Sequence, residues 1–133
     1  MRRDFHLPEE DRDHLNAEGL VWEAVAENGM QWFLLHTVPV PSGYNVATVT
    51  VAVQIPPGYP DTALDMAYFY PTLARADGRM IRNTESIQVI EGKSFQRWSR
   101  HRTGVNPWQP GVDCLANHLL LVRDWLAREF EAR

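Results

Sequence analysis

Alternation of apolar and polar positions is clearest in residues 46–55, where valine occupies positions 49, 51 and 53 and polar or small residues stand between them. A period of two is typical of a strand with one buried face. Three further segments also favour strands by their content of apolar, β-branched and aromatic residues. They are residues 20–27, 31–40 and 64–70.

The pair Asn28-Gly29 stands between the first two of these strands. This dipeptide favours the type I′ turn of a two-residue hairpin. The four strands therefore predict an antiparallel meander. Residues 86–90 suggest one additional short strand, and Glu91-Gly92 and Ala76-Asp77-Gly78 predict turns.

Helical periodicity replaces this pattern from Val112 onward. Apolar residues recur at a spacing of four, three and four, which is typical of a helix with one buried face. We expect Asp113 to cap this helix and the apolar stripe to pack on the sheet. The stripe consists of Leu115, Leu119, Val122 and Leu126.

A second helix is predicted near the N-terminus, where Pro8 and the acidic residues after it favour a first helical turn and Gly19 ends the pattern. A helix, a meander, an irregular stretch and a long helix form an α+β architecture. The length of 133 residues fits one domain, residues 1–133.

Composition narrows the function classes. One cysteine among 133 residues excludes an internal disulfide and a cysteine-only zinc site. A net charge of −4 without a basic block argues against a nucleic-acid partner. No apolar run has the ~20 residues of a membrane span, and no apolar stretch follows the basic N-terminus. We expect a cytoplasmic protein with no membrane partner, no metal and no cofactor.

Three proline motifs occur in a fixed order along the chain. They are Ile55-Pro56-Pro57-Gly58-Tyr59-Pro60, Phe69-Tyr70-Pro71-Thr72 and Trp108-Gln109-Pro110. With the elements between them, they resemble the motifs that surround the active site of ubiquitin-conjugating enzymes. Arg97-Trp98-Ser99-Arg100-His101, followed by Trp108 and Asp113, is most similar to the bacterial branch of this superfamily.

The resemblance implies a ubiquitin-conjugating (UBC-like) fold with an N-terminal helix, a four-stranded antiparallel meander, and a helix after the active-site loop. It implies three partners, namely a ubiquitin-like protein, a ubiquitin-activating-like adenylating enzyme and a target protein. Bacterial members are encoded near such proteins and near a JAB-type metallopeptidase, and a role in antiphage defence is implied.

The chain departs from the family pattern at its reactive position. The family's cysteine lies about eight residues before the tryptophan, and Ser99, Arg100 and His101 occupy that region here. Tyr70 and Thr72 replace the family's histidine and asparagine. The resemblance therefore implies either serine chemistry or a relative that only binds.

Ser99 is the first candidate nucleophile. A serine hydroxyl needs a nearby base, and residues two apart in extended chain face the same side, so His101 is the candidate base. We expect Arg100 to point elsewhere or to attract the acyl carbonyl. The alternative is a polar loop in which the serine and histidine satisfy backbone groups.

Other candidates have structural alternatives. Cys114 is the only thiol and is predicted just inside a helix, but we favour a core role for it. Tyr70, Thr72 and Trp108 are predicted to support the active site, although a packing role is open for Tyr70 and a turn for Thr72. His36 and His118 lack metal-ligand spacing and are expected to be surface or satisfied histidines. Core positions are predicted for Trp22, Trp32 and Trp125.

The leading interpretation is a transferase that accepts a ubiquitin-like protein on Ser99 as an oxyester and passes it to a target amine. The alternative is a catalytically inactive module that binds a ubiquitin-like protein or its activating enzyme. A small serine hydrolase is a third interpretation, without a Gly-x-Ser-x-Gly motif to support it.

Overall fold

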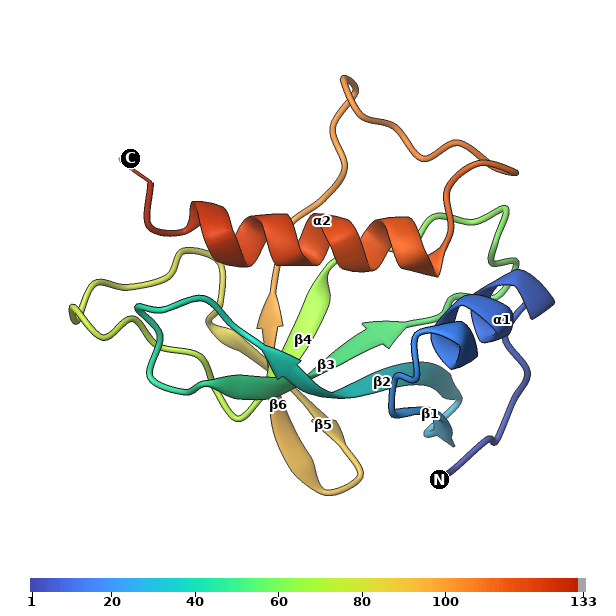
Figure 1. The fold of residues 1–133 in the computed structure, drawn as a ribbon, viewed down its shortest axis with the longest axis horizontal. Helices are drawn as coiled ribbons and strands as arrows, with labels where there is room; N and C mark the ends of the chain where they lie inside the picture. The colour runs from blue at the N-terminus through green and yellow to red at the C-terminus, as the bar shows by residue number, and fades with distance from the viewer. Residues whose placement is uncertain (132–133) are drawn as a thin grey trace.

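The computed structural model describes residues 1–131, so the last two residues of the predicted 1–133 domain lie outside the described residues. The chain forms two helices and six strands within that range (Figure 1). These elements are α1 (Glu9–Ala17), β1 (Trp22–Glu27), β2 (Met30–Pro39), β3 (Thr48–Gln54), β4 (Ala67–Tyr70), β5 (Ser86–Ile90), β6 (Lys93–Trp98) and α2 (Leu115–Arg128). Within residues 1–131, neither helix has the length and apolarity needed to cross a bilayer.

The α+β class and the antiparallel meander are confirmed, but the prediction of a four-stranded sheet is wrong. All six strands belong to one sheet in the order β1-β2-β3-β4-β6-β5. Every pairing is antiparallel. The hairpin at Asn28-Gly29 is also confirmed, because both residues have positive φ and Glu27 pairs with Met30.

Strand β6 escaped prediction because a buried polar side chain breaks its apolar pattern. Gln96 is 4% exposed, and its side-chain amide bonds in both directions to Leu73. The Leu73 N–H donates to Gln96 Oε1 at 3.0 Å, and Gln96 Nε2 donates to the Leu73 carbonyl at 3.1 Å. The polar residue therefore anchors the segment after β4 instead of marking an exposed loop.

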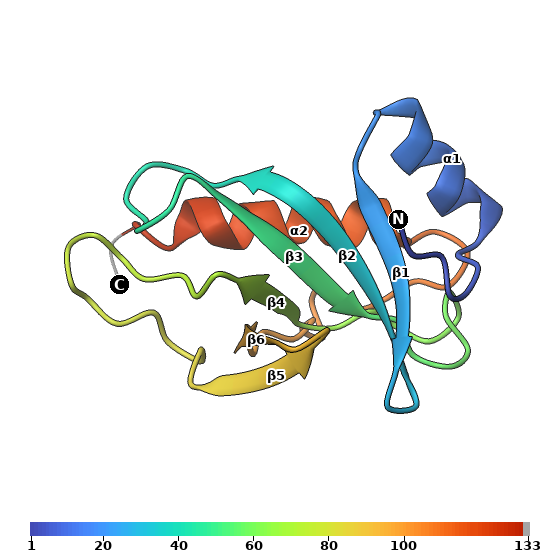
Figure 2. The same ribbon diagram turned by 90° about the horizontal axis from the view of Figure 1, so that it is seen from below.

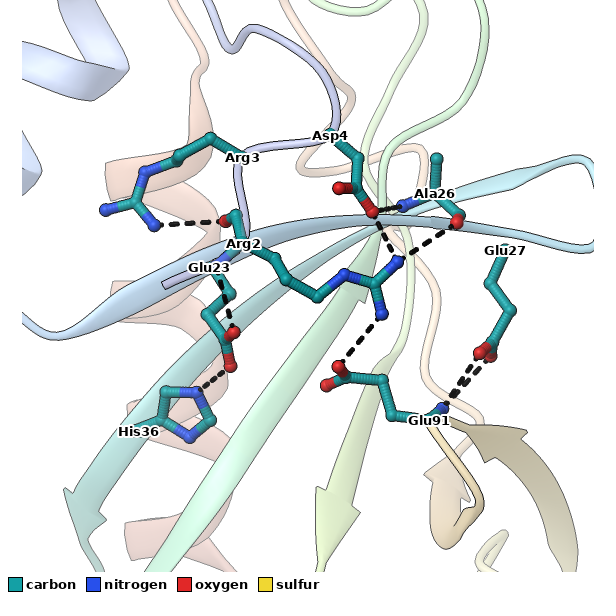
Figure 3. A network of polar contacts seen from close by, with 8 residues as sticks. All are labelled: Arg2, Arg3, Asp4, Glu23, Ala26, Glu27, His36 and Glu91. Carbon is teal, nitrogen blue, oxygen red and sulfur yellow. Dashed lines mark hydrogen bonds and ion pairs between the residues drawn. The ribbon is translucent and has the colours of Figure 1, made fainter.

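The β5–β6 hairpin gives the sheet a second core. Ile90 and Phe95 pack on the face turned away from α2, against Val25, Trp32 and Tyr68. The hairpin also contacts the far end of the sheet (Figure 3). The N–H of Glu91 donates to the Glu27 carboxylate, and Arg2 Nη1 donates to Glu91 Oε2 at 3.0 Å. These contacts hold the sheet in a curled shape.

The main core lies between the opposite face of the sheet and α2, which crosses that face (Figures 1 and 2). The predicted stripe is confirmed, since its four residues are 7% exposed or less. Trp22, Trp32 and Trp125 are buried as predicted. Burial of each such apolar side chain contributes roughly 1.5–3 kcal/mol.

Tyr59 connects α1, the proline-rich segment and α2. Its hydroxyl donates to Asp11 Oδ2 at 2.5 Å and accepts from the Leu115 N–H at 2.7 Å. Burial raises the pKa of Asp11, and burial together with the Asp11 hydrogen bond raises the pKa of Tyr59. Tyr59 thus satisfies one of the unpaired N–H groups at the start of α2.

The predicted cap at Asp113 is wrong. Cys114 is the N-cap residue, with extended backbone and no side-chain capping bond. Asp113 instead accepts from the Gln109 N–H at 2.7 Å and from Asn117 at 3.2 Å. The hydrogen bond from Gln109 lowers the pKa of Asp113. The Leu115 N–H at the start of α2 therefore bonds to Tyr59, which is distant in the sequence, and not to a neighbouring cap residue.

Replacing Tyr59 by phenylalanine should destabilise the protein by about 1–3 kcal/mol, because the Leu115 N–H and the Asp11 carboxylate both lose a partner. Urea denaturation would measure the change in free energy of unfolding. Tyr70→Phe, at an exposed tyrosine, is the matched control. Equal stability of the two variants would show that the Tyr59 hydroxyl does not join these elements.

Candidate functional site

Ser99 follows directly after β6, where the sheet ends. Its N–H donates to the Asn83 carbonyl at 2.8 Å, which continues the pairing of β6 with the segment before β5. Arg100 then bonds back to Trp98 through its N–H at 3.1 Å. The chain leaves the sheet here, and in Figure 1 the segment between β6 and α2 extends beyond α2 before it returns to the start of that helix.

Ser99, His101 and Asp65 form a row of hydrogen-bonded side chains. Ser99 Oγ lies 3.4 Å from His101 Nε2, and His101 Nδ1 lies 2.7 Å from Asp65 Oδ2. An ionised carboxylate only accepts hydrogen bonds, so it favours the tautomer with the proton on Nδ1. Nε2 then presents a lone pair to the serine hydroxyl. The row is open to solvent, with side-chain exposures of 60% for His101 and 43% for Asp65.

Met66 holds the segment of Asp65 against the segment of Ser99. It has positive φ, and its N–H donates to the Arg100 carbonyl at 3.3 Å. Its own carbonyl accepts from His118 Nε2 at 2.8 Å. His118 lies on α2 and is 1% exposed, so a buried residue of this helix holds Met66 in place.

A cavity of about 510 Å³ adjoins the row, and Asp65 and His101 form part of its wall. Arg102 and Trp108 line it as well. Trp108 Nε1 donates to the Pro60 carbonyl at 3.0 Å, which ties this loop to the proline-rich segment. The Arg102 guanidinium lies 5.0 Å from the centre of the Trp108 ring.

The structure separates the other predicted site residues from Ser99. Tyr70 lies at the opposite end of β4, with its ring 5.5 Å from that of Phe95. Thr72 is exposed beyond it, and its carbonyl accepts from Asn45. The Arg100 guanidinium lies 5.1 Å from the centre of the Trp125 ring. Of the predicted support residues, only Trp108 lines the cavity.

The remaining candidates also lie apart. Cys114 is partly exposed and lines a smaller pocket with Asp11 and Tyr59. His36 bonds to Glu23 at 2.6 Å and to Thr50 at 3.2 Å (Figure 3 shows the first contact). In the described part of the chain, no three His, Cys, Asp or Glu side chains are grouped closely enough to hold a metal ion.

Sequence reasoning missed Asp65, His118 and Arg102 as site residues. Asp65 stands 36 positions before His101, and no local spacing links them. His118 interrupts the apolar stripe of α2 at a buried position, which was a usable signal for a structural hydrogen bond. Arg102 adjoins His101 in the sequence, but only the folded chain places it in the wall of the cavity.

His118 should make the stability of the protein pH-dependent. Burial lowers its pKa below the ordinary value of about 6.5, and Nε2 must carry a proton to reach Met66 while Nδ1 has no partner within residues 1–131. As the pH falls below ~6.5, His118 binds a proton in the unfolded chain but stays neutral in the folded protein. Stability is therefore lost from that pH downward, by at most ~1.4 kcal/mol per pH unit.

Denaturation of the wild type and of His118→Gln between pH 7 and 5 would measure this loss. The glutamine retains an N–H donor for Met66 and does not titrate, so its curve should be flatter. His14→Gln, at an exposed histidine, should retain the wild-type slope. Identical slopes for wild type and His118→Gln would contradict the assignment.

Comparison with known families matches residues 7–129 to prokaryotic E2 family E. Comparison with curated proteins and with solved structures finds no match. The matched range includes both helices, all six strands, Asp65, and the Ser99–His101 segment. Because the match spans nearly the whole chain, this protein belongs to prokaryotic E2 family E.

Proposed function

We propose that this protein is an E2-like transferase that carries a ubiquitin-like protein on Ser99 as an oxyester. Membership of a prokaryotic E2 family supports the general role in conjugation with ubiquitin-like proteins and activating enzymes. The observation that carries the finer proposal is the approach of His101 Nε2 to Ser99 Oγ at 3.4 Å. A base at this position is what a serine acceptor requires.

The proposed reaction has two steps. The acyl group arrives as an adenylate or a thioester of an adenylating enzyme. Ser99 Oγ forms a bond to the acyl carbon, the bond to AMP or to the enzyme's sulfur breaks, and His101 takes the serine proton. A target amine then attacks the same carbon, the bond to Ser99 breaks, and the serine regains a proton.

The distance of 3.4 Å is longer than a good hydrogen bond, and free enzymes often have such loose catalytic contacts. The exposure of His101 gives a partner room to cover the site. Exclusion of water by the bound ubiquitin-like protein would strengthen the charge interactions there. The alternative of an inactive binding module is an outcome of the first test below.

Ser99→Ala should abolish the covalent adduct formed with a ubiquitin-like protein and adenylating enzyme of the same genome and ATP. The wild-type adduct should survive thiol reductant and be cleaved by mild base, because thiols cleave thioesters much faster than oxyesters. Ser99→Cys should form a reductant-sensitive adduct, since a thiol ionises more readily. His101→Ala should slow the serine protein by ~10²–10⁴-fold and the cysteine variant much less.

Gel electrophoresis with and without reductant, and mass spectrometry of the modified peptide, would read these outcomes. An adduct at the native rate on Ser99→Ala would exclude Ser99. Absence of an adduct from every variant, with measurable binding of the ubiquitin-like protein, would favour the binding module.

Cys114→Ala should leave adduct formation unchanged and cost little stability. The thiol makes no capping bond, and Cys114 contributes to α2 mainly through its carbonyl, which accepts from the His118 N–H at 3.1 Å. The same adduct assay and a thermal melt would test both parts. A well-folded Cys114→Ala protein that forms no adduct would move the acceptor from Ser99 to Cys114.

A further inference from the structure

We infer that Ser99, His101 and Asp65 act as a Ser–His–Asp triad that hydrolyses small activated esters without any protein partner. Asp65 is the positioning residue in this inference. The inference concerns the same serine as the proposed function, and it rests on that function only for the role of Ser99 as acyl acceptor. It adds hydrolysis as an activity, small activated esters as the substrate class, and Asp65 as a residue of the site.

The geometry gives each member a distinct role. Asp65 Oδ2 lies 2.7 Å from His101 Nδ1, the short contact expected between a carboxylate and an N–H donor. Because the carboxylate keeps the proton on Nδ1, Nε2 is left to accept the serine proton. The contacts come from two segments, one before β4 and one after β6, so the triad exists only in the folded chain.

The backbone around Asp65 is fixed more firmly than its exposure suggests. Met66, the next residue, bonds through its N–H to Arg100 and through its carbonyl to the buried His118. The bond to Arg100 joins the two triad segments, and the bond to His118 attaches Met66 to α2. A solvated ion pair would contribute little by itself, but this junction holds the carboxylate within reach of the imidazole.

Ser99 does not line the adjoining open cavity, but Asp65 and His101 do, so a small acyl group on Ser99 would have this space next to it. The volume of the cavity is about 510 Å³, and Asp65 and Arg102 bring charged side chains to its wall beside His101. Asp113 lies 3.7 Å from the Arg102 guanidinium. Arg102 is the positively charged side chain of this wall, so its charge would favour negative charge that develops on an acyl oxygen nearby.

The reaction consumes one water and returns the enzyme unchanged. Ser99 Oγ bonds to the ester carbon, the alcohol leaves by cleavage of the carbon–oxygen bond, and the serine proton passes through His101 Nε2 to that leaving group. Water then attacks the acyl-serine, His101 takes its proton, and the bond to Ser99 breaks as the serine is reprotonated. The open site admits this water, which a bound protein partner would exclude.

The test uses the purified 133-residue chain and p-nitrophenyl acetate. The expected result is catalytic release of nitrophenol, with an acetyl group found on Ser99 by mass spectrometry after an acid quench. Ser99→Ala should reduce the rate of nitrophenol release to the background rate at which surface histidines hydrolyse the ester. Absence of acetyl-Ser99 in the wild type, or an undiminished rate in Ser99→Ala, would overturn the inference.

Asp65→Asn should lower the rate of Ser99 acetylation by ~10²–10⁴-fold. Asp65→Glu should recover part of it, because a carboxylate is restored. Asp61→Asn, at an exposed carboxylate of the same segment, should have the wild-type rate. In a Ser99→Cys background Asp65→Asn should cost much less, since a thiol depends less on its base. An equal loss in both backgrounds would show that Asp65 is merely structural, as would a loss that Asp65→Glu does not reverse.

The two proposals fail separately. Acetyl-Ser99 without a ubiquitin-like adduct would leave the esterase standing and remove the conjugating role of Ser99. A reductant-resistant adduct on Ser99 without esterase activity would keep the conjugating role and remove this inference.

Discussion

Hydrogen bonds between polar side chains and distant backbone groups hold in place the end of the sheet next to Ser99. Two long irregular segments, residues 55–66 and 99–114, meet there and have few regular backbone bonds of their own. Buried backbone groups must find partners. Tyr59 bonds to the Leu115 N–H, and His118 bonds to the Met66 carbonyl. Each of these two bonds joins residues more than 50 positions apart in the sequence.

Electrostatics at the site depend on how much water remains. His101 and Asp65 are exposed, so their interaction is screened in the free protein. His118 and Asp11 are buried. Burial lowers the pKa of His118 and raises the pKa of Asp11, and each change favours the uncharged form of the side chain. Buried polar side chains thus lie beneath the site, and the side chains proposed to react are exposed to solvent. A partner that covers the surface would change the reactivity of the row without rearranging the core.

The curled sheet determines which residues meet. The β5–β6 hairpin pairs with β4 through β6, covers the second face of the sheet, and touches Glu27 and Arg2 through Glu91. The N-terminal segment also pairs with β1, where the Asp4 N–H donates to the Ala24 carbonyl. This arrangement directs the end of β6 toward the start of β4, and Ser99 thereby approaches Asp65.

The sequence by itself determined the elements whose periodicity is local. The meander of the first four strands, the Asn28-Gly29 turn and the apolar stripe of α2 follow from alternation, turn chemistry and helical spacing. The serine and histidine two residues apart were also identified, because extended chain places them on one side. Strand β6 was missed, since Gln96 gives a buried strand a polar pattern.

Only the tertiary structure decided the surroundings of Ser99. Asp65 joins His101 across 36 positions, Tyr59 replaces Asp113 at the start of α2, and Tyr70 lies at the wrong end of β4 to accompany Ser99. Periodicity and capping rules describe neighbours along the chain. Contacts between distant segments depend on strand order and sheet curvature, which no local pattern encodes.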